Sequence, residues 1–160
     1  KEVYELSCRV ICEGLKDMGL MKGDPAEAVA AGAHAMFFPC GLGHMMGLDV
    51  HDMENLGEVW VGYNGEPKST QFGRKSLRLA RPLEPGFVLT IEPGIYFIPE
   101  LIDYRKSENR FTDFICYDKL DAWRGFTGLR NEEDYLITET GAQLLGKRIP
   151  MSADEVEAIR

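Results

Sequence analysis

Two of the three histidines in this 160-residue chain lie seven positions apart in a glycine-rich stretch, residues 39–52. Three glycines fall within seven residues there, and each would cost up to about 1 kcal/mol relative to alanine inside a helix. The stretch is therefore expected to be extended or turning. In a regular strand His44 and His51 would point to opposite faces, because they are an odd number of residues apart. They can meet at one site only if the chain bends, and Gly47 offers the place to bend.

Two glutamates stand in similarly unusual settings further along the chain. Glu92 follows the apolar run 87–91 and precedes Pro93 and Gly94, so its carboxylate is expected to be stiffly held. Glu132 lies in the charged run 130–134. One imidazole with carboxylates suits manganese, zinc, cobalt or iron better than calcium or magnesium. The alternative for the histidines is a glycine-rich hairpin in which they are incidental.

Three segments carry a resemblance to a known family. They are GLGHMMGLDVHD at 41–52, LTIEPGIY at 89–96 and RNEEDYLIT at 130–138. In this order they resemble the pita-bread metallopeptidases, in the branch of prolidase and Xaa-Pro aminopeptidase. The resemblance implies an α+β fold with a mainly antiparallel curved sheet and helices on one face. It also implies that residues 1–160 form a single unit, the C-terminal part of a pita-bread catalytic domain.

The resemblance implies a metal centre of two divalent ions. In the family two aspartates, a histidine and two glutamates hold these ions, and the last three match His44, Glu92 and Glu132. The neighbouring Glu133 is an alternative for the final position, although adjacent residues of a strand point to opposite faces. The two aspartates are expected upstream of the helix matching residues 3–18, outside this chain. Manganese is the expected metal, with cobalt or zinc as alternatives.

The same resemblance implies hydrolysis of the peptide bond before proline. His51 matches a histidine that touches the substrate, and Arg78 matches an arginine that binds the C-terminal carboxylate of a dipeptide. Arg130 matches an arginine near the metals, and Glu92 is a candidate proton shuttle. Without the family, His51 would be a turn histidine beside Asp52, Arg78 a solvated charge, and Arg130 an ion-pair partner.

One departure from the family pattern supports a second hypothesis. Cys40 stands where the family usually has a histidine, and a thiol is a poorer proton relay. The alternative function is therefore a pita-bread peptide-binding module without peptidase activity. Since two of five ligands are expected elsewhere, the 160 residues alone are expected to be inactive.

The acidic composition limits the partners. With 26 acidic and 18 basic residues the formal net charge is −8, which argues against a nucleic-acid partner. No apolar run is long enough for a membrane span, and no secretory signal is recognisable. The four cysteines show no metal-binding spacing and are expected to be reduced thiols. The interpretation is a cytoplasmic homodimer that acts on proline-containing dipeptides or short peptides.

Local patterns predict the secondary structure. Helices are expected at 3–18, at 25–36 and after Ser152, where a capping box with Glu155 begins a terminal helix. His34, on the second helix, is expected to be a packed residue rather than a ligand. Strands are expected at 58–61, 87–91, 95–98 and 134–138, with a loop at 62–76 and a long excursion at 99–121 that contains a short helix near 113–117.

Overall fold

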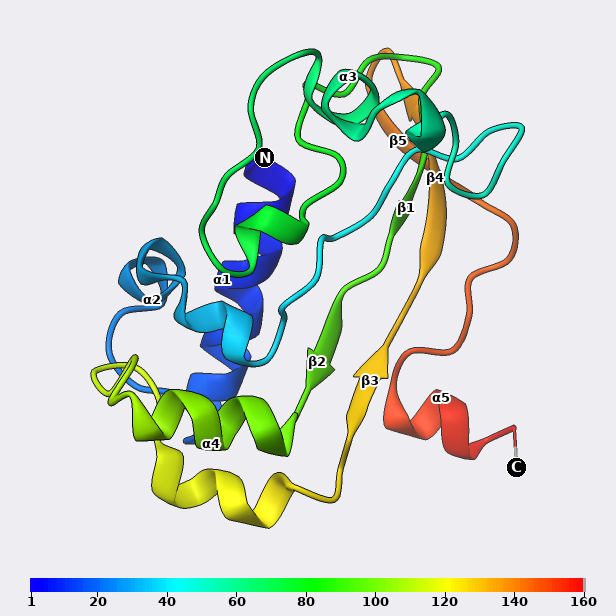
Figure 1. The fold of residues 1–160 in the computed structure, drawn as a ribbon. Coiled ribbons are helices and arrows are strands. Elements are labelled where there is room, and N and C mark those ends of the chain that lie inside the picture. Colours follow the sequence, from blue (N-terminus) through cyan, green and yellow to red (C-terminus); the bar gives the residue numbers. More distant parts are fainter. Residues whose placement is uncertain (160) are drawn as a thin grey trace.

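The computed structural model describes residues 1–159, which form helices around a bent antiparallel ladder (Figure 1). The helices are α1 (Glu2–Asp17), α2 (Pro25–Ala31), α3 (Glu58–Tyr63), α4 (Pro99–Ser107) and α5 (Ala153–Glu157). The strands are β1 (Val88–Ile91), β2 (Gly94–Tyr96), β3 (Gly128–Arg130), β4 (Glu133–Thr138) and β5 (Gly141–Leu145). Short 3-10 turns cover Ala33–Met36, Glu54–Leu56, Arg74–Ser76 and Tyr117–Trp123.

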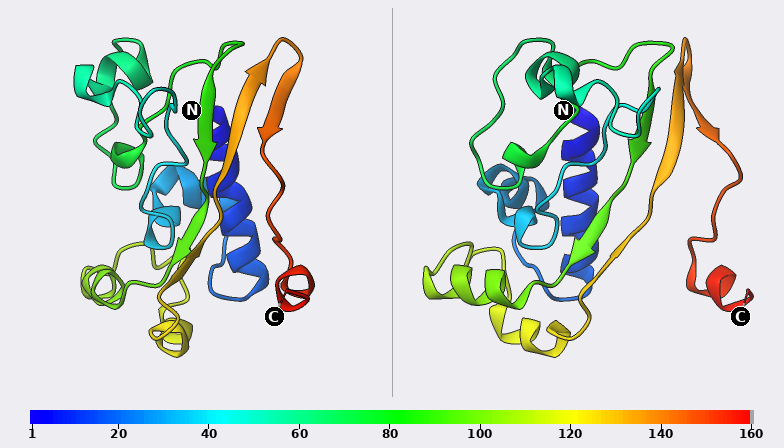
Figure 2. Two further views of the ribbon diagram at one scale, coloured as in Figure 1. Left: turned by 90° about the vertical axis from the view of Figure 1, so that its right-hand side faces the viewer. Right: turned by 45° about the vertical axis from the view of Figure 1, so that its right-hand side comes forward.

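The ladder consists of two sheets that follow one another along the same pair of chain segments. β4 pairs with both β1 and β5, while β2 pairs with β3, all antiparallel. β1 and β2 do not pair with each other but follow one another along one segment, with Glu92 and Pro93 between them. Figure 2 shows the two segments side by side in both views, with α1 along them. This confirms the mainly antiparallel α+β class.

The core lies between α1, α2 and the segment that follows α2. On α1 the buried face is made by Tyr4, Cys8, Ile11, Cys12 and Leu15. Further along the chain, Phe97 packs against Phe37 and Trp123, with ring centroids 5.5 and 4.9 Å apart.

The helix predicted at 3–18 is confirmed as α1, and part of its apolar surface is exposed. Val3, Leu6, Val10 and Met18 are about half exposed, between 47% and 55%. They form a second apolar stripe, which a partner surface outside these residues could cover.

His34 is fully buried, as expected for a packed residue, and its Nε2 atom lies 3.1 Å from the hydroxyl of Tyr4. Burial lowers the pKa of His34 to about 4, so the ring is neutral at pH 7. The four cysteines are free thiols. Among residues 1–159, no helix combines the length and apolar character that crossing a membrane requires.

Three predicted elements need correction. The strand expected at 58–61 is the helix α3, which Asn64 ends in the left-handed conformation. The helix expected at 25–36 breaks at Gly32, whose φ of 85° ends α2 before a 3-10 turn continues the path. The excursion at 99–121 contains α4, which starts with Pro99 at its first position, and a 3-10 segment, instead of a short helix near 113–117.

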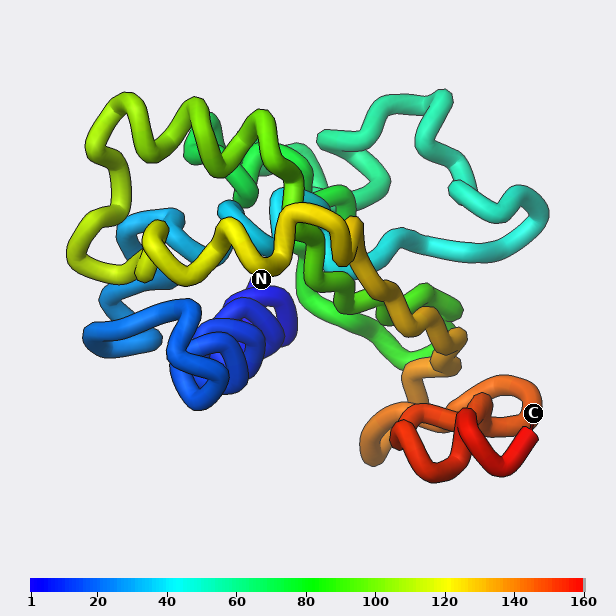
Figure 3. The backbone as a smooth tube through the Cα atoms, turned by 90° about the horizontal axis from the view of Figure 1, so that it is seen from below, coloured from blue at the N-terminus to red at the C-terminus, as the bar shows by residue number. Residues whose placement is uncertain are grey.

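The C-terminal region extends the ladder. β5 is not among the strands that the sequence patterns predict. The capping box of Ser152 and Glu155 is present and begins α5 (Figure 3 shows this helix beyond the ladder).

Candidate metal and substrate site

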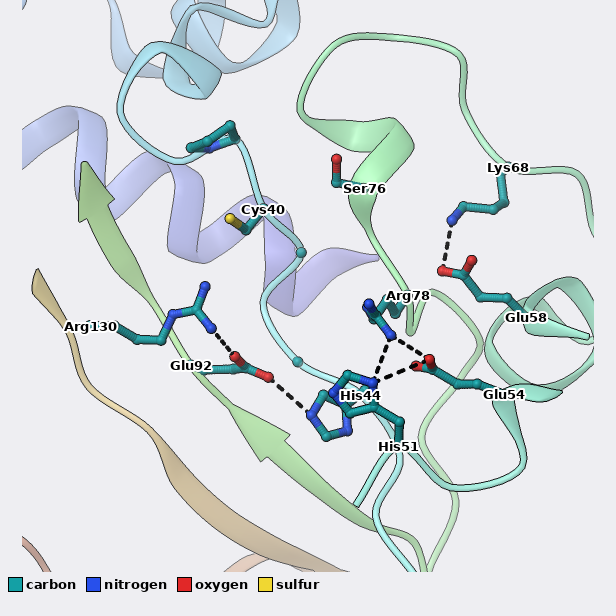
Figure 4. Close-up of a pocket in the computed structure, with 13 residues that line it drawn as sticks. Cys40, His44, His51, Glu54, Glu58, Lys68, Ser76, Arg78, Glu92 and Arg130 are labelled. Carbon is teal, nitrogen blue, oxygen red and sulfur yellow. Dashed lines mark hydrogen bonds and ion pairs between the residues drawn. The ribbon is translucent and has the colours of Figure 1, made fainter. Parts of the chain in front are cut away.

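A pocket of about 610 Å³ lies between the histidine stretch, the bend of the ladder and the loop before β1 (Figure 4). It contains five of the six side chains predicted for the site. Its lining consists of Pro39, Cys40, Gly41, Gly43, His44, His51, Glu54, Glu58, Lys68, Ser76, Arg78, Glu92 and Arg130. Glu132 is the predicted site residue that does not line it.

Backbone pairing with β1 holds His44 in place. The amide of Thr90 donates to the carbonyl of His44 at 3.0 Å, and the amide of His44 donates to the Thr90 hydroxyl at 3.0 Å. The amide of Glu92 donates to the carbonyl of Leu42 at 2.7 Å. Residues 42–46 therefore run as an added strand beside β1, and Gly43 allows the close approach. His44 is nearly buried as a result, with 5% of its surface exposed.

A second hydrogen bond sets the tautomer of His44. Its Nδ1 atom lies 2.9 Å from the carbonyl oxygen of Met45, which can only accept, so Nδ1 carries the proton. In the neutral ring the Nε2 atom then carries the lone pair. This lone pair faces the carboxylate of Glu92, with Nε2 and Oε1 3.3 Å apart.

Glu92 is buried and fixed from two sides. The hydroxyl of Thr90 donates to its Oε1 at 3.0 Å, and Nη1 of Arg130 donates to its Oε2 at 2.5 Å. Arg130 is itself oriented by its Nε, which donates to the hydroxyl of Tyr96 at 2.7 Å. Partial burial lowers the pKa of Arg130, but Tyr96 and Glu92 outweigh that effect and leave it above its ordinary value. The guanidinium is thus always a cation beside Glu92.

His44 and Glu92 fit a divalent cation. A neutral imidazole lone pair and a carboxylate oxygen are both acceptors, and at 3.3 Å they cannot satisfy each other. A cation bound by both would satisfy both, and the bond from Nδ1 to a carbonyl is the usual way to orient a metal-binding histidine. The donor types also match the metals that accept nitrogen and oxygen together.

The third predicted ligand does not join this pair. Glu132 is exposed, and residues 1–159 contain no group of three histidine, cysteine or carboxylate side chains placed to hold a metal. The register of β1 and β4 nevertheless distinguishes Glu132 from the neighbouring Glu133. Thr90 lies opposite Asp134 and Ile91 opposite Glu133, and cross-strand partners share a face. If the alternation of β4 continues to the position before the strand begins, Glu132 shares the face of Thr90 and Glu92, and Glu133 lies on the other.

The second histidine reaches the same pocket after the chain turns back near Gly47. The ring centroids of His44 and His51 lie 4.0 Å apart, so the two rings meet at one site. On its far side, Nδ1 of His51 lies 3.0 Å from Nη1 of Arg78. An arginine can only donate, so Nδ1 accepts and the proton of the neutral His51 ring lies on Nε2.

The sequence patterns missed the acidic side of the pocket. Nη1 of Arg78 also donates to Glu54, which was not singled out, and Glu54 lies 3.4 Å from Nδ1 of His51. Nearby, Nζ of Lys68 donates to Glu58 at 2.7 Å. No local pattern marks these residues, because each pair joins distant positions of an irregular segment. Glu58 was also assigned to a strand that does not exist.

Taken together, the bent antiparallel ladder and the histidine–carboxylate pair define a metallopeptidase type of site. Residues 1–139 match the model of metallopeptidase family M24, and the chain belongs to this family. Its solved neighbours are aminopeptidase P structures, which share the pita-bread fold.

Individual relatives extend over nearly the whole chain. It is 40% identical over 157 residues to the Xaa-Pro dipeptidase of Homo sapiens, which covers 98% of this chain and 30% of the relative. It is 40% identical over 140 residues to an Xaa-Pro dipeptidase of Stenotrophomonas maltophilia, and the match covers 88% of this chain and 31% of that relative. Proline aminopeptidase P II from Yersinia pestis superposes with a TM-score of 0.67 at 33% identity, covering 99% of this chain and 28% of that one. Aminopeptidase P of Escherichia coli with the inhibitor Pro-Leu gives 0.66 at 34% identity, over the same shares.

Proposed function

We propose that this chain forms part of a dinuclear metallopeptidase that cleaves the bond before proline in dipeptides or short peptides. One observation carries the proposal: the lone pair of His44 faces the buried carboxylate of Glu92 in a pocket that also holds His51 and Arg78. The relatives named Xaa-Pro dipeptidase and aminopeptidase P support the substrate class. Because the chain spans about 30% of those dipeptidases, it would act together with further chain outside these residues.

In this proposal His44, Glu92 and Glu132 hold the metals together with two aspartates that lie elsewhere. Manganese is proposed, with cobalt or zinc as alternatives, and one Escherichia coli aminopeptidase P is described as zinc-substituted. Two divalent cations, when bound, would supply an activated water and stabilise negative charge during peptide hydrolysis. The placement of Glu132 on the Glu92 face of the ladder supports its choice over Glu133.

The remaining polar groups would bind and orient the substrate. With Arg78 donating to Nδ1, His51 presents its Nε2 proton as a hydrogen-bond donor to the peptide. Arg130 would fix Glu92 through Oε2, and Glu92 is the residue that would shuttle a proton during hydrolysis. Arg78 would contact the carboxylate of a dipeptide, since a planar guanidinium suits this task.

We further propose a cytoplasmic homodimer without nucleic-acid or membrane partners. The net charge of −8 opposes binding to polyanions, and the free cysteines suit a reducing compartment. The half-exposed apolar stripe of α1 (Val3, Leu6, Val10 and Met18) would be covered by the rest of the protein or by a second subunit.

A peptide-binding module without hydrolytic activity is the second candidate. It is favoured by Cys40, which lines the pocket where the family usually places a histidine. A thiol there could not relay protons as an imidazole does. The pocket, His51 and the ion-paired Arg78 and Arg130 could still bind a peptide without hydrolysing it.

Turnover separates the two candidates. The full-length protein loaded with Mn²⁺ is expected to release proline from alanyl-proline, whereas the isolated 160 residues should be inactive and bind metal weakly. The physical reason is that only two donors meet in residues 1–159. Proline release and calorimetric metal titration measure these outcomes. A full-length protein inert with manganese, cobalt and zinc would favour the binding module, and turnover by the 160 residues would refute the assigned ligands.

Arg78→Ala tests the contact with the substrate carboxylate. KM for alanyl-proline should rise about ten-fold, with a smaller change for alanyl-prolinamide, which has no carboxylate there. Steady-state kinetics of the full-length protein measures both. Arg124→Ala is the matched control, because Arg124 pairs with Asp103 and Asp121 and does not line the pocket. Equal losses on the acid and the amide would remove the carboxylate role.

A further inference from the structure

The charges lining the pocket are fully paired. Three cations and three glutamates line it, and they form three ion pairs: Arg78 with Glu54, Lys68 with Glu58, and Arg130 with Glu92 (Figure 4). Among the described residues, no cation of this lining is left over for an incoming carboxylate. A dipeptide that ends in proline brings such a carboxylate, so it must share a cation that already has a partner.

Arg78 is the cation for which this matters most. Glu54 reaches it from 24 positions away and binds Nη1, the same nitrogen that donates to His51. Glu54 is the less exposed partner, with 22% of its side chain accessible against 42% for Arg78. Glu54 begins a 3-10 turn after Met53, which is left-handed with φ of 56°, and its carboxylate contacts both Arg78 and His51.

We propose that Glu54 is a specificity-determining residue that competes with the substrate carboxylate for Arg78. The inference rests on the proposed function, because it takes the substrate to be an Xaa-Pro peptide. A second carboxylate at this guanidinium meets the like charge of Glu54, which disfavours binding. An amide or a peptide that continues beyond proline brings no such charge. Glu54 therefore shifts selectivity away from dipeptides and towards longer substrates.

Glu54→Gln tests the competition in the full-length protein loaded with Mn²⁺. The glutamine keeps the size of the side chain and removes its charge. KM for alanyl-proline should fall about five-fold, which corresponds to about 1 kcal/mol, the upper range for a partly exposed ion pair. The ratio of KM for alanyl-prolinamide to KM for alanyl-proline should rise by about the same factor. An unchanged or higher KM for alanyl-proline would overturn the proposal and make Glu54 a support for Arg78.

Two further variants separate a local effect from a general one. Glu58→Gln removes the same charge from the same pocket but frees Lys68, so its effect on the ratio of the two KM values should be less than half as large. Glu54→Gln combined with Arg78→Ala should show no gain over Arg78→Ala alone, because the competition needs the guanidinium. An equal gain from Glu58→Gln, or a gain that persists without Arg78, would refute the competition.

Failure of the proposed function is distinguishable from failure of this inference. If the wild-type protein cleaves neither substrate, the peptidase proposal falls. Calorimetric binding of alanyl-proline to wild type and to Glu54→Gln then decides the inference: about five-fold tighter binding by the variant supports it, and equal or weaker binding overturns it.

Discussion

Replacing His44 by alanine in the full-length protein is expected to lower kcat/KM for alanyl-proline by about a thousand-fold, on the order of 4 kcal/mol in the barrier. The variant loses the nitrogen lone pair that faces Glu92 at 3.3 Å. Glu92 would remain bonded to Thr90 and Arg130, and no other described histidine could replace the donor. His51 cannot do so while its Nδ1 accepts from Arg78.

Metal content gives a second measurement, independent of turnover. Elemental analysis of the His44→Ala protein should show fewer bound manganese ions per chain than wild type, with unchanged helix content by circular dichroism. His34→Gln is the control, because this buried histidine lies outside the pocket beside Tyr4. It should lower the thermal midpoint while keeping the full metal content. Wild-type metal content and activity in His44→Ala would show that His44 is not a ligand.

Elements with strong local signals were predictable from sequence. The capping box at Ser152 and Glu155 fixes the start of α5, and the continuous apolar, β-rich run fixes β1. The proline and glycine after Glu92 mark the interruption between β1 and β2. In each case the residues that determine the structure are neighbours in sequence, so a short window contains the necessary information.

Elements that depend on contacts with distant residues, or on the residue at which they end, were not predictable from sequence. Residues 58–61 are rich in β-formers, but propensity differences are tenths of a kcal/mol, and the left-handed Asn64 and the packing of Tyr63 favour the helix α3. β5 is a strand because it pairs with β4. Its residues, from Gly141 to Leu145, are nearly all exposed. The strand therefore has no buried face that an alternating apolar pattern in the sequence could mark.

The same division applies to the site. The motifs around His44 and Glu92 identified the metal side of the pocket, because glycine and proline there mark unusual backbone in the sequence. Glu54 was missed, since its importance comes from Arg78, 24 positions away and reached through an irregular segment. The position of Glu132 relative to Glu92 depends on side-chain placement at the bend and stays a prediction.

Gly43→Ala is expected to destabilise the protein by about 3 kcal/mol and to abolish most of its activity. A Cβ at this position would lie 1.9 Å from the carbonyl oxygen of Thr90, which belongs to the backbone of β1 and cannot rotate away. The two segments would have to separate, which would break the bonds between the backbones of His44 and Thr90 and between Glu92 and Leu42. Chemical denaturation measures the loss of stability.

The loss of activity should exceed what unfolding alone explains. A shift of His44 by an ångström relative to Glu92 is enough to disturb a site that depends on their 3.3 Å separation. The matched control is Gly14→Ala in α1, where an added Cβ meets no neighbouring atom within 4 Å. Alanine should stabilise that helix by about 0.5–1 kcal/mol and leave kcat/KM unchanged. If Gly43→Ala were as stable and active as wild type, residues 42–46 could not lie against β1 as they do here, and the geometry that supports the metal site would be wrong.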